Sequence, residues 1–465
     1  MNQAGSKTYG YIAVNALICL LTIFYRIHNA DLHTASTLYV QSWAILSLVA
    51  IHSYAWMRQG GSDLSLAYLF FLMVFIFNCG KAILFVFFPN YHEPLFSFFN
   101  ERHSLVLIRA YEYSYLCLFA MSAAMLFAGN HQPIRQQPIP SKQLEAIKLT
   151  GALFLLVSVP AALYDLLDMI RLVLSGGYFA LFNTEQAYGA SGIVKVLGFF
   201  LFPALYITLI GYHDNRRIVR VLFVLAAVFT LAKLAMGARL VALVPFLIML
   251  SLCDVSIRRV GRKAIYMIAA GLIVVVFPAL SLLRVGDQLE EGGGMAHSLF
   301  VIVKEMSDSI SPLVWIMQRV PSEMDFINGH SFLLAASTAV PNLFWDVHPA
   351  QKGSLSSWLV NEVDPWMAAQ GGGFGFSIFA EFYLNFYWFG IPLLFLTTLL
   401  ITRLAKVRAN PINTAFCFSC FLGLMLWPRG ELVAVARFII WNAGIPWLCY
   451  RILIGLIPAF RLHNR

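Results

Sequence analysis

The chain has 465 residues, 60% of them hydrophobic and only 12% charged, and its mean hydropathy is +0.74. This composition excludes a soluble domain and is typical of a polytopic membrane protein. The net charge of +9 does not indicate nucleic-acid binding, because the basic residues lie in small groups between apolar runs and form no single patch.

Apolar runs of about 17 to 25 residues, the length that crosses a bilayer as a helix, recur along the whole chain. The seventh and eighth runs are separated only by Gly237. The pattern predicts an all-α fold, a polytopic membrane helix bundle of about 12 transmembrane helices. The runs lie roughly at 8–25, 37–57, 64–88, 105–128, 148–169, 192–212, 218–236, 238–254, 264–283, 375–402, 411–428 and 436–457.

Positive charges divide the connecting loops into two alternating sets. The loops of one set hold most of the lysines and arginines, often in clusters, whereas the short loops of the other set hold mostly single arginines. Because lysine and arginine are retained in cytoplasmic loops, the first set is predicted to be cytoplasmic. Both termini then lie in the cytoplasm, which requires an even number of spans.

One connection, residues 284–374, is far longer than the others and falls on the exterior side. It divides one integral membrane domain into transmembrane helices 1–9 at 1–283 and transmembrane helices 10–12 at 375–465. Amphipathic spacing predicts a short helix within 298–320. A second stretch, 354–369, carries two tryptophans that suit the membrane–water interface. Glycine clusters at both ends of the loop either permit hinge motion or form tight turns.

Several arginines lie at the exterior mouths of predicted spans, where positive charge is unusual. They are Arg171, Arg239, Arg284 and Arg429, and Arg437 follows two helical turns after the last of these. A guanidinium group binds phosphate oxygens in bidentate fashion, so the set predicts a site for a phosphate or diphosphate. The alternative is that each arginine reaches lipid headgroups or pairs with a nearby carboxylate, such as Asp287 or Glu431.

Two acceptor groups lie deep in an apolar run. Glu381 and Asn385 are four residues apart and therefore share one face of a helix. A carboxylate at this position needs a partner. It acts either as a general base for a sugar hydroxyl or as a group that orients an arginine; the structural alternative is an ion pair that holds the bundle together. His330 in the long loop is a second candidate base, unless it is only solvated.

Other charged residues within the spans have mainly structural interpretations. Arg109 and Glu112 are three residues apart and are predicted to pair on one helix. Lys81, Lys195 and Lys233 are embedded in spans and serve either as interior salt bridges or as contacts to lipid headgroups. The sequence contains no metal-binding motif and no nucleotide-binding motif, which leaves a nucleotide-driven pump unsupported.

Three sequence elements resemble those of a known family. The first is a G-x-G…E-x-x-x-N-x-x-x-x-G pattern, the second is a loop element followed by a proline, and the third is an arginine–glycine pair before the last span. They comprise Gly373, Gly375, Glu381, Asn385 and Gly390; Asn328, Gly329, His330, Ser331, Phe332 and Pro341; and Arg429 with Gly430. With the large exterior loop before the third-last span, these elements resemble the bacterial O-antigen polymerases of the Wzy type.

The resemblance implies a metal-independent glycosyltransferase that polymerises oligosaccharide repeat units linked to undecaprenyl diphosphate. It implies a place at the periplasmic face of the bacterial inner (cytoplasmic) membrane, with loop 284–374 in the periplasm. The implied partners are the lipid-linked oligosaccharide, membrane lipid, a chain-length regulator and a flippase of the same pathway. No cofactor and no nucleic acid is implied.

The resemblance also implies roles for the candidate residues. The five arginines bind the diphosphate leaving group, Glu381 and His330 are catalytic and activate or orient the acceptor hydroxyl, and Asn385 has an orienting role. The sequence departs from some polymerases because it lacks a clear pair of arginine-x10-glycine elements in two exterior loops. Two alternatives stay open: an O-antigen ligase, which transfers polymer to the lipid A core, and a polysaccharide flippase or other carrier.

Overall fold

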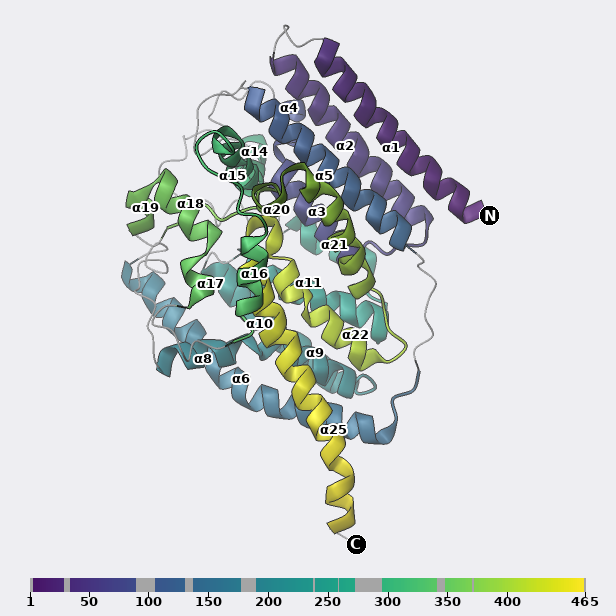
Figure 1. The fold of residues 1–465 in the computed structure, drawn as a ribbon. Coiled ribbons are helices and arrows are strands. Elements are labelled where there is room, and N and C mark those ends of the chain that lie inside the picture. Colours follow the sequence, from purple (N-terminus) through teal and green to yellow (C-terminus); the bar gives the residue numbers. More distant parts are fainter. Residues whose placement is uncertain are drawn as a thin grey trace.

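The computed structural model describes residues 3–28, 34–88, 105–129, 137–176, 190–236, 239–257, 259–271, 295–340, 348–369 and 372–463. Over these ranges the protein is helical and contains no β-strand (Figure 1), which confirms the predicted all-α fold. Within them, eight helices are long and apolar enough to cross a membrane, and a bent pair supplies a ninth. The count of about twelve stays a prediction.

The first group of helices comes mainly from the N-terminal part of the chain. Helices α1 (Gln3–His28), α2 (Thr34–Arg58) and α5 (Leu105–Ala128) pack together, and α5 also packs along α21 (Gly390–Leu404), as Figure 1 shows. The bent pair is α3 (Leu66–Cys79) and α4 (Lys81–Phe87), which meet at 65°. This group of helices therefore joins segments that are far apart in the sequence.

The second group surrounds a long helix, α6 (Ser141–Gly176), which packs against α8, α9 and α25. Helices α10 and α11 pack against each other, and α22 packs on α9 and α11. Their bounds are Ala190–Phe199 for α8, Leu201–Gly211 for α9, Arg216–Ala235 for α10, Arg239–Ser256 for α11, Arg262–Gly271 for α12, Pro411–Ser419 for α22 and Ile445–His463 for α25.

The long connection forms short helices, as its amphipathic stretches predict. These helices gather on the left in Figure 1, on the opposite side of the molecule from the N-terminus. Trp366 is 71% exposed, whereas Trp358 packs its ring 5.4 Å from that of Trp315. The helices are α14 (Met295–Met306), η3 (Ser307–Ile310), α15 (Ser311–Arg319), α16 (His330–Ser337), α17 (Pro349–Lys352), α18 (Leu355–Val363) and α19 (Pro365–Ala369).

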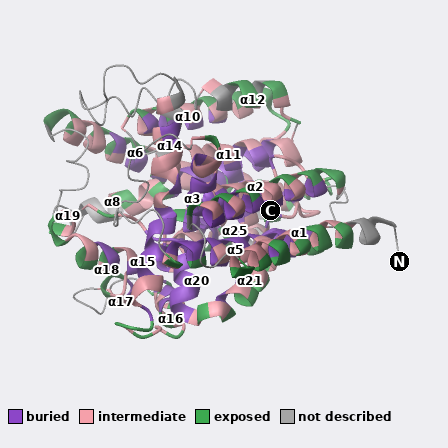
Figure 2. Cartoon of the chain, turned by 90° about the horizontal axis from the view of Figure 1, so that it is seen from above, coloured by how far each residue is buried: buried purple, intermediate pink, exposed green. Residues whose placement is uncertain are grey.

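Candidate membrane spans at Ile378–Leu404, Pro411–Arg429 and Leu432–Ile457 match the three predicted C-terminal spans, and each contains a local irregularity. The first span consists of α20 (Ile378–Phe386), the 3₁₀ turn η4 (Tyr387–Phe389) and α21. The second ends in the 3₁₀ turn η5 (Trp427–Arg429), and the third contains a π-helical turn, η6 (Ile440–Gly444). Helix α23 (Phe421–Leu424) lies before η5, and α24 (Leu432–Ile439) lies between η5 and η6. Figure 2 shows buried residues concentrated in the interior, and nearly all of α20 is buried there. Non-helical backbone at this depth is tolerated only where protein groups satisfy it.

Ion pairs between helices correct one expectation from the sequence and confirm the interior salt bridge that was one alternative for Lys81. Glu112 forms its ion pair with Arg26 of α1 and not with Arg109, which contributes only a longer-range electrostatic attraction. Lys81 lies directly after the bend at Gly80 and is fully buried. Its Nζ atom donates to Asp308 of η3 at 2.8 Å, and Ser311 Oγ donates to the same carboxylate at 2.9 Å. The long connection is therefore anchored in the bundle by an interior ion pair.

The Lys81–Asp308 pair predicts a stability difference between single and double variants. Lys81→Met is expected to reduce the free energy of unfolding by about 3 kcal/mol, because it leaves a carboxylate without its cation. The double variant Lys81→Met with Asp308→Leu should regain much of that loss. Thermal unfolding of the purified protein in detergent measures both, with exposed Lys142→Met as the control. Equal midpoints for wild type and Lys81→Met would contradict the prediction.

Candidate functional site

The glycine-rich segment before α20 lies against the backbone around Arg429. Gly375 has a φ of +76°, and a Cβ atom there would lie 2.8 Å from the carbonyl oxygen of Arg429. The same oxygen accepts a hydrogen bond from the Phe376 backbone N–H at 3.2 Å. Glycine is required here because it alone adopts this conformation without strain and permits the close approach. Two of the motifs found in the sequence are therefore in contact.

The Glu381 carboxylate joins three segments of the chain. It is fully buried. One oxygen accepts a hydrogen bond from Ser331 Oγ, and the other accepts from Trp427 Nε1 and from the Leu432 backbone N–H, all at 2.8 Å. A buried carboxylate is stable when donors of this kind replace its hydration. Within the described ranges Glu381 forms no ion pair, and its carboxylate is stabilised by neutral hydrogen-bond donors alone.

Asn385 completes this network on the same face of α20, as the four-residue spacing predicts. Its Nδ2 atom donates to Ser331 Oγ at 2.9 Å and to the Glu381 carbonyl oxygen at 2.7 Å. Ser331 Oγ thus accepts a hydrogen bond from Asn385 and donates one to Glu381. Asn385 is only 1% exposed, and its hydrogen bond to Ser331 orients the start of α16.

A third polar bridge was not foreseen from the sequence. Asn78 of α3 donates to the Pro428 carbonyl oxygen at 3.0 Å and accepts from Ser377 Oγ at 2.5 Å. Ser377 also caps α20 by accepting from the Ala380 N–H at 3.2 Å. The available signal was an asparagine inside an apolar run, because such a side chain requires buried partners.

Glu431 has different partners from the one that its sequence position suggests. Its carboxylate accepts hydrogen bonds from Ser354 Oγ at 2.6 Å and from the Leu355 backbone N–H at 2.5 Å. It therefore satisfies the N-terminus of α18, where a negative charge is favoured. The alternative that Glu431 pairs with Arg429 is therefore wrong, and this carboxylate does not neutralise the arginine.

Three of the five predicted arginines have exposed side chains in the described part of the structure, and the side chains of the other two lie outside it. Arg429 and Arg437 are exposed, and neither forms an ion pair with another described residue. Arg171 is exposed on α6. Arg239 is the first residue of α11, but its side chain lies outside the described part, and Arg284 falls outside the described residues altogether. The network around Glu381 fixes the backbone on both sides of Arg429.

His330 lies at the edge of the same network. It is the exposed first residue of α16, directly before Ser331, and Gly329 precedes it with a φ of +84°. The turn at Gly329 starts α16 and directs Ser331 inward to Glu381. His330 therefore combines solvent access with a backbone fixed by buried hydrogen bonds.

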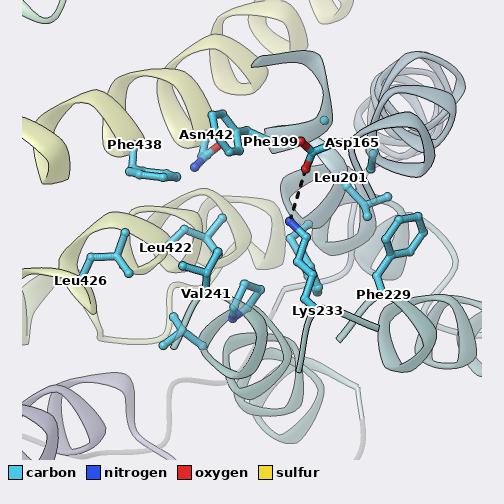
Figure 3. A pocket seen from close by; sticks show the side chains of 15 residues that line it. Asp165, Phe199, Leu201, Phe229, Lys233, Val241, Leu422, Leu426, Phe438 and Asn442 are labelled. Carbon is cyan, nitrogen blue, oxygen red and sulfur yellow. Dashed lines mark ion pairs between the residues drawn. The ribbon is translucent and has the colours of Figure 1, made fainter. Parts of the chain in front are cut away.

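A cavity of about 60 Å³ lies beside this assembly. Its walls are mostly phenylalanine, leucine and valine, with Asp165, Lys233 and Asn442 as its polar groups (Figure 3). The segments that carry four of the five predicted arginines also supply lining residues. These pairs are Arg171 with Asp165 on α6, Arg239 with Val241 on α11, Arg429 with Leu426 before η5, and Arg437 with Phe438 on α24.

The comparison with protein families matches the description "O-antigen polysaccharide polymerase Wzy" over residues 11–459. The chain belongs to the Wzy family. Searches of curated proteins and of solved structures returned no match. The family match covers the first half of the chain as well as the second, where the sequence motifs lie. Membership assigns to this multi-pass membrane protein a polymerase activity on lipid-linked oligosaccharide repeat units.

The buried network of this Wzy-family protein predicts that Glu381 is needed for folding of the site. Glu381→Gln is expected to lower the free energy of unfolding by about 1–3 kcal/mol. The amide NH₂ group cannot accept the hydrogen bonds that one carboxylate oxygen accepts, so it leaves buried donors without an acceptor. The measurement is the thermal unfolding midpoint in detergent, with exposed Glu362→Gln as the matched control. A normally stable Glu381→Gln protein that has lost all activity would instead support direct base catalysis.

Proposed function

We propose that this protein polymerises undecaprenyl-diphosphate-linked repeat units into O-antigen or a related surface polysaccharide at the periplasmic face of the inner membrane. The proposal includes cytoplasmic termini and a periplasmic loop 284–374. One observation carries it: buried hydrogen bonds to Glu381 and Asn78 hold the segment of Arg429, while the arginine itself stays exposed and without an ion pair among the described residues.

The arginines serve the leaving group. In the reaction, the acceptor hydroxyl oxygen bonds to the anomeric carbon of the growing chain. The bond from that carbon to the diphosphate breaks, and undecaprenyl diphosphate leaves with the electron pair. Cations placed where this negative charge develops stabilise the transition state. Arg429 and Arg437 are the described candidates, and Arg171, Arg239 and Arg284 belong to the same proposal.

The acceptor hydroxyl must lose a proton in this reaction. His330 is exposed and lies one residue from the contact between Ser331 and Glu381, so it is our candidate for the base. Glu381 is fully buried and already accepts three hydrogen bonds. We therefore assign it the role of orienting the arginine segment, and Asn385 supports it through Ser331.

Arginine variants test this proposal. Arg429→Ala and Arg437→Ala should each reduce kcat for chain extension by about 100-fold, because each removes a donor to the departing diphosphate. Replacement by lysine should rescue only part of the activity, since the bidentate fork is lost. The measurement is polymerisation of purified lipid-linked repeat units by reconstituted protein without an energy source, with exposed Arg217→Ala of α10 as the control.

The same assay distinguishes the alternatives. Normal chain lengths from both alanine variants would refute the arginine site. A reconstituted wild-type protein that extends no chain, but transfers preformed polymer to the lipid A core, would be a ligase.

His330→Ala should lower kcat for chain extension while leaving the unfolding midpoint unchanged, because the His330 side chain is exposed. Full activity of that variant would remove His330 as the base.

A further inference from the structure

Lys233 is a partly buried lysine of the bundle and differs in this from Lys81. It lies in the last turn of α10 and reaches into the cavity toward Asp165 of α6 (Figure 3). The two charged groups are 4.0 Å apart, and their side chains are 21% and 20% exposed. Lys81, by comparison, is fully buried and lies 2.8 Å from Asp308. The Lys233–Asp165 pair is therefore long and open to the cavity, whereas the Lys81–Asp308 pair is closed.

Asn442 supplies a second polar group from another element. It lies in η6, is 2% exposed, and lines the same cavity. Its Oδ1 atom has no hydrogen-bond partner among the described residues. An unpaired amide oxygen at this depth costs free energy, and no hydrogen bond to Oδ1 holds the amide in its present orientation. Since the amide carries both donors and an acceptor, it can also present its NH₂ to an anion.

The size and walls of the cavity suit a compact polar group attached to an apolar chain. Its volume of about 60 Å³ exceeds the space that one water molecule needs. Phe199, Phe229, Phe438 and Leu426 line it beside the polar groups. A phosphoryl group that enters this space would meet a lysine cation in surroundings of low polarity, where charge–charge attraction is strong.

We propose that Lys233 and Asn442 form a binding subsite for a phosphoryl group of the lipid-linked substrate, separate from the exposed arginines. In the free protein Asp165 balances the lysine charge. When substrate binds, Lys233 exchanges the carboxylate for a phosphate oxygen, and Asn442 donates to a second oxygen. This inference rests on the proposed function and adds two residues to its substrate site. The chemistry recognised is a phosphoryl group on an apolar chain, which a membrane phospholipid also carries.

Binding measurements on Lys233 and Asp165 variants test the subsite. We would measure the Kd of radiolabelled undecaprenyl diphosphate for the purified full-length protein in detergent. Lys233→Met should raise the Kd by about 10- to 100-fold, because a charge-assisted hydrogen bond is lost. Asp165→Asn should leave the Kd unchanged or lower it, since it removes the competing carboxylate. Lys233→Arg should keep most of the affinity, and exposed Lys195→Met of α8 should bind as wild type does.

Opposite changes in Kd for Lys233→Met and Asp165→Asn distinguish a phosphoryl subsite from a structural ion pair. If Lys233→Met and Asp165→Asn raise the Kd equally, the pair is structural and the proposal is overturned. If Arg429→Ala weakens binding but Lys233→Met does not, the subsite fails while the proposed function stands. If wild type does not bind undecaprenyl diphosphate, both fail. Equal displacement of the label by phosphatidylglycerol would make the cavity a phospholipid site and overturn the substrate assignment.

If Lys233→Met does not fold, Lys233→Arg and Asp165→Asn still decide the matter. Both retain a polar side chain of similar size at the position. The subsite requires Asp165→Asn to bind at least as tightly as wild type. A weaker affinity of Asp165→Asn, in a protein with an unchanged unfolding midpoint, would overturn the exchange of partners.

Discussion

A fully buried carboxylate joins the parts of this protein that its sequence motifs identify. Glu381 has no contact with solvent, and its two oxygens are satisfied by a serine hydroxyl, an indole N–H and a backbone N–H from two other segments. Removing a carboxylate from water is costly unless such donors replace the solvent. The network therefore requires α16, α20 and the turn around η5 to assemble together. The exposed Arg429 lies on that turn, so its position depends on groups that never reach the surface.

The broken helices of the C-terminal part create the need for this network. Each break leaves backbone groups without helical partners in an apolar interior. Side chains of neighbouring elements satisfy two of them: Asn78 donates to the Pro428 carbonyl oxygen, and Glu381 accepts from the Leu432 N–H. The segments at these irregularities supply Leu426 and Phe438 to the cavity wall and also carry the exposed Arg429 and Arg437. Irregular backbone that is held by buried polar groups is a common way to build a site inside a helical membrane protein.

The cations of the bundle fall into classes that follow from their surroundings. Lys81 is closed off with Asp308 and anchors the long connection to the bend between α3 and α4. Arg429 and Arg437 face outward without a carboxylate among the described residues. Lys233 lies between these cases, with a carboxylate at the limit of ion-pair distance and open space beside it. All four residues carry a positive charge, so charge does not distinguish their roles. The distance from each cation to a carboxylate and the space beside it for a ligand distinguish them.

Residue spacing was sufficient for the local features of this protein. Apolar runs predicted the helical bundle, amphipathic spacing predicted the helices of the long connection, and the interval between Glu381 and Asn385 placed both on one face, because these properties depend on neighbours within a few residues. Tertiary structure decided the partners. Glu381 meets Trp427 across 46 residues and Asn78 meets Pro428 across 350, whereas proximity in sequence suggested wrong partners for Glu112 and Glu431. A buried polar group takes whichever donor the packing of distant helices brings within 3 Å or so, and no local pattern records that choice.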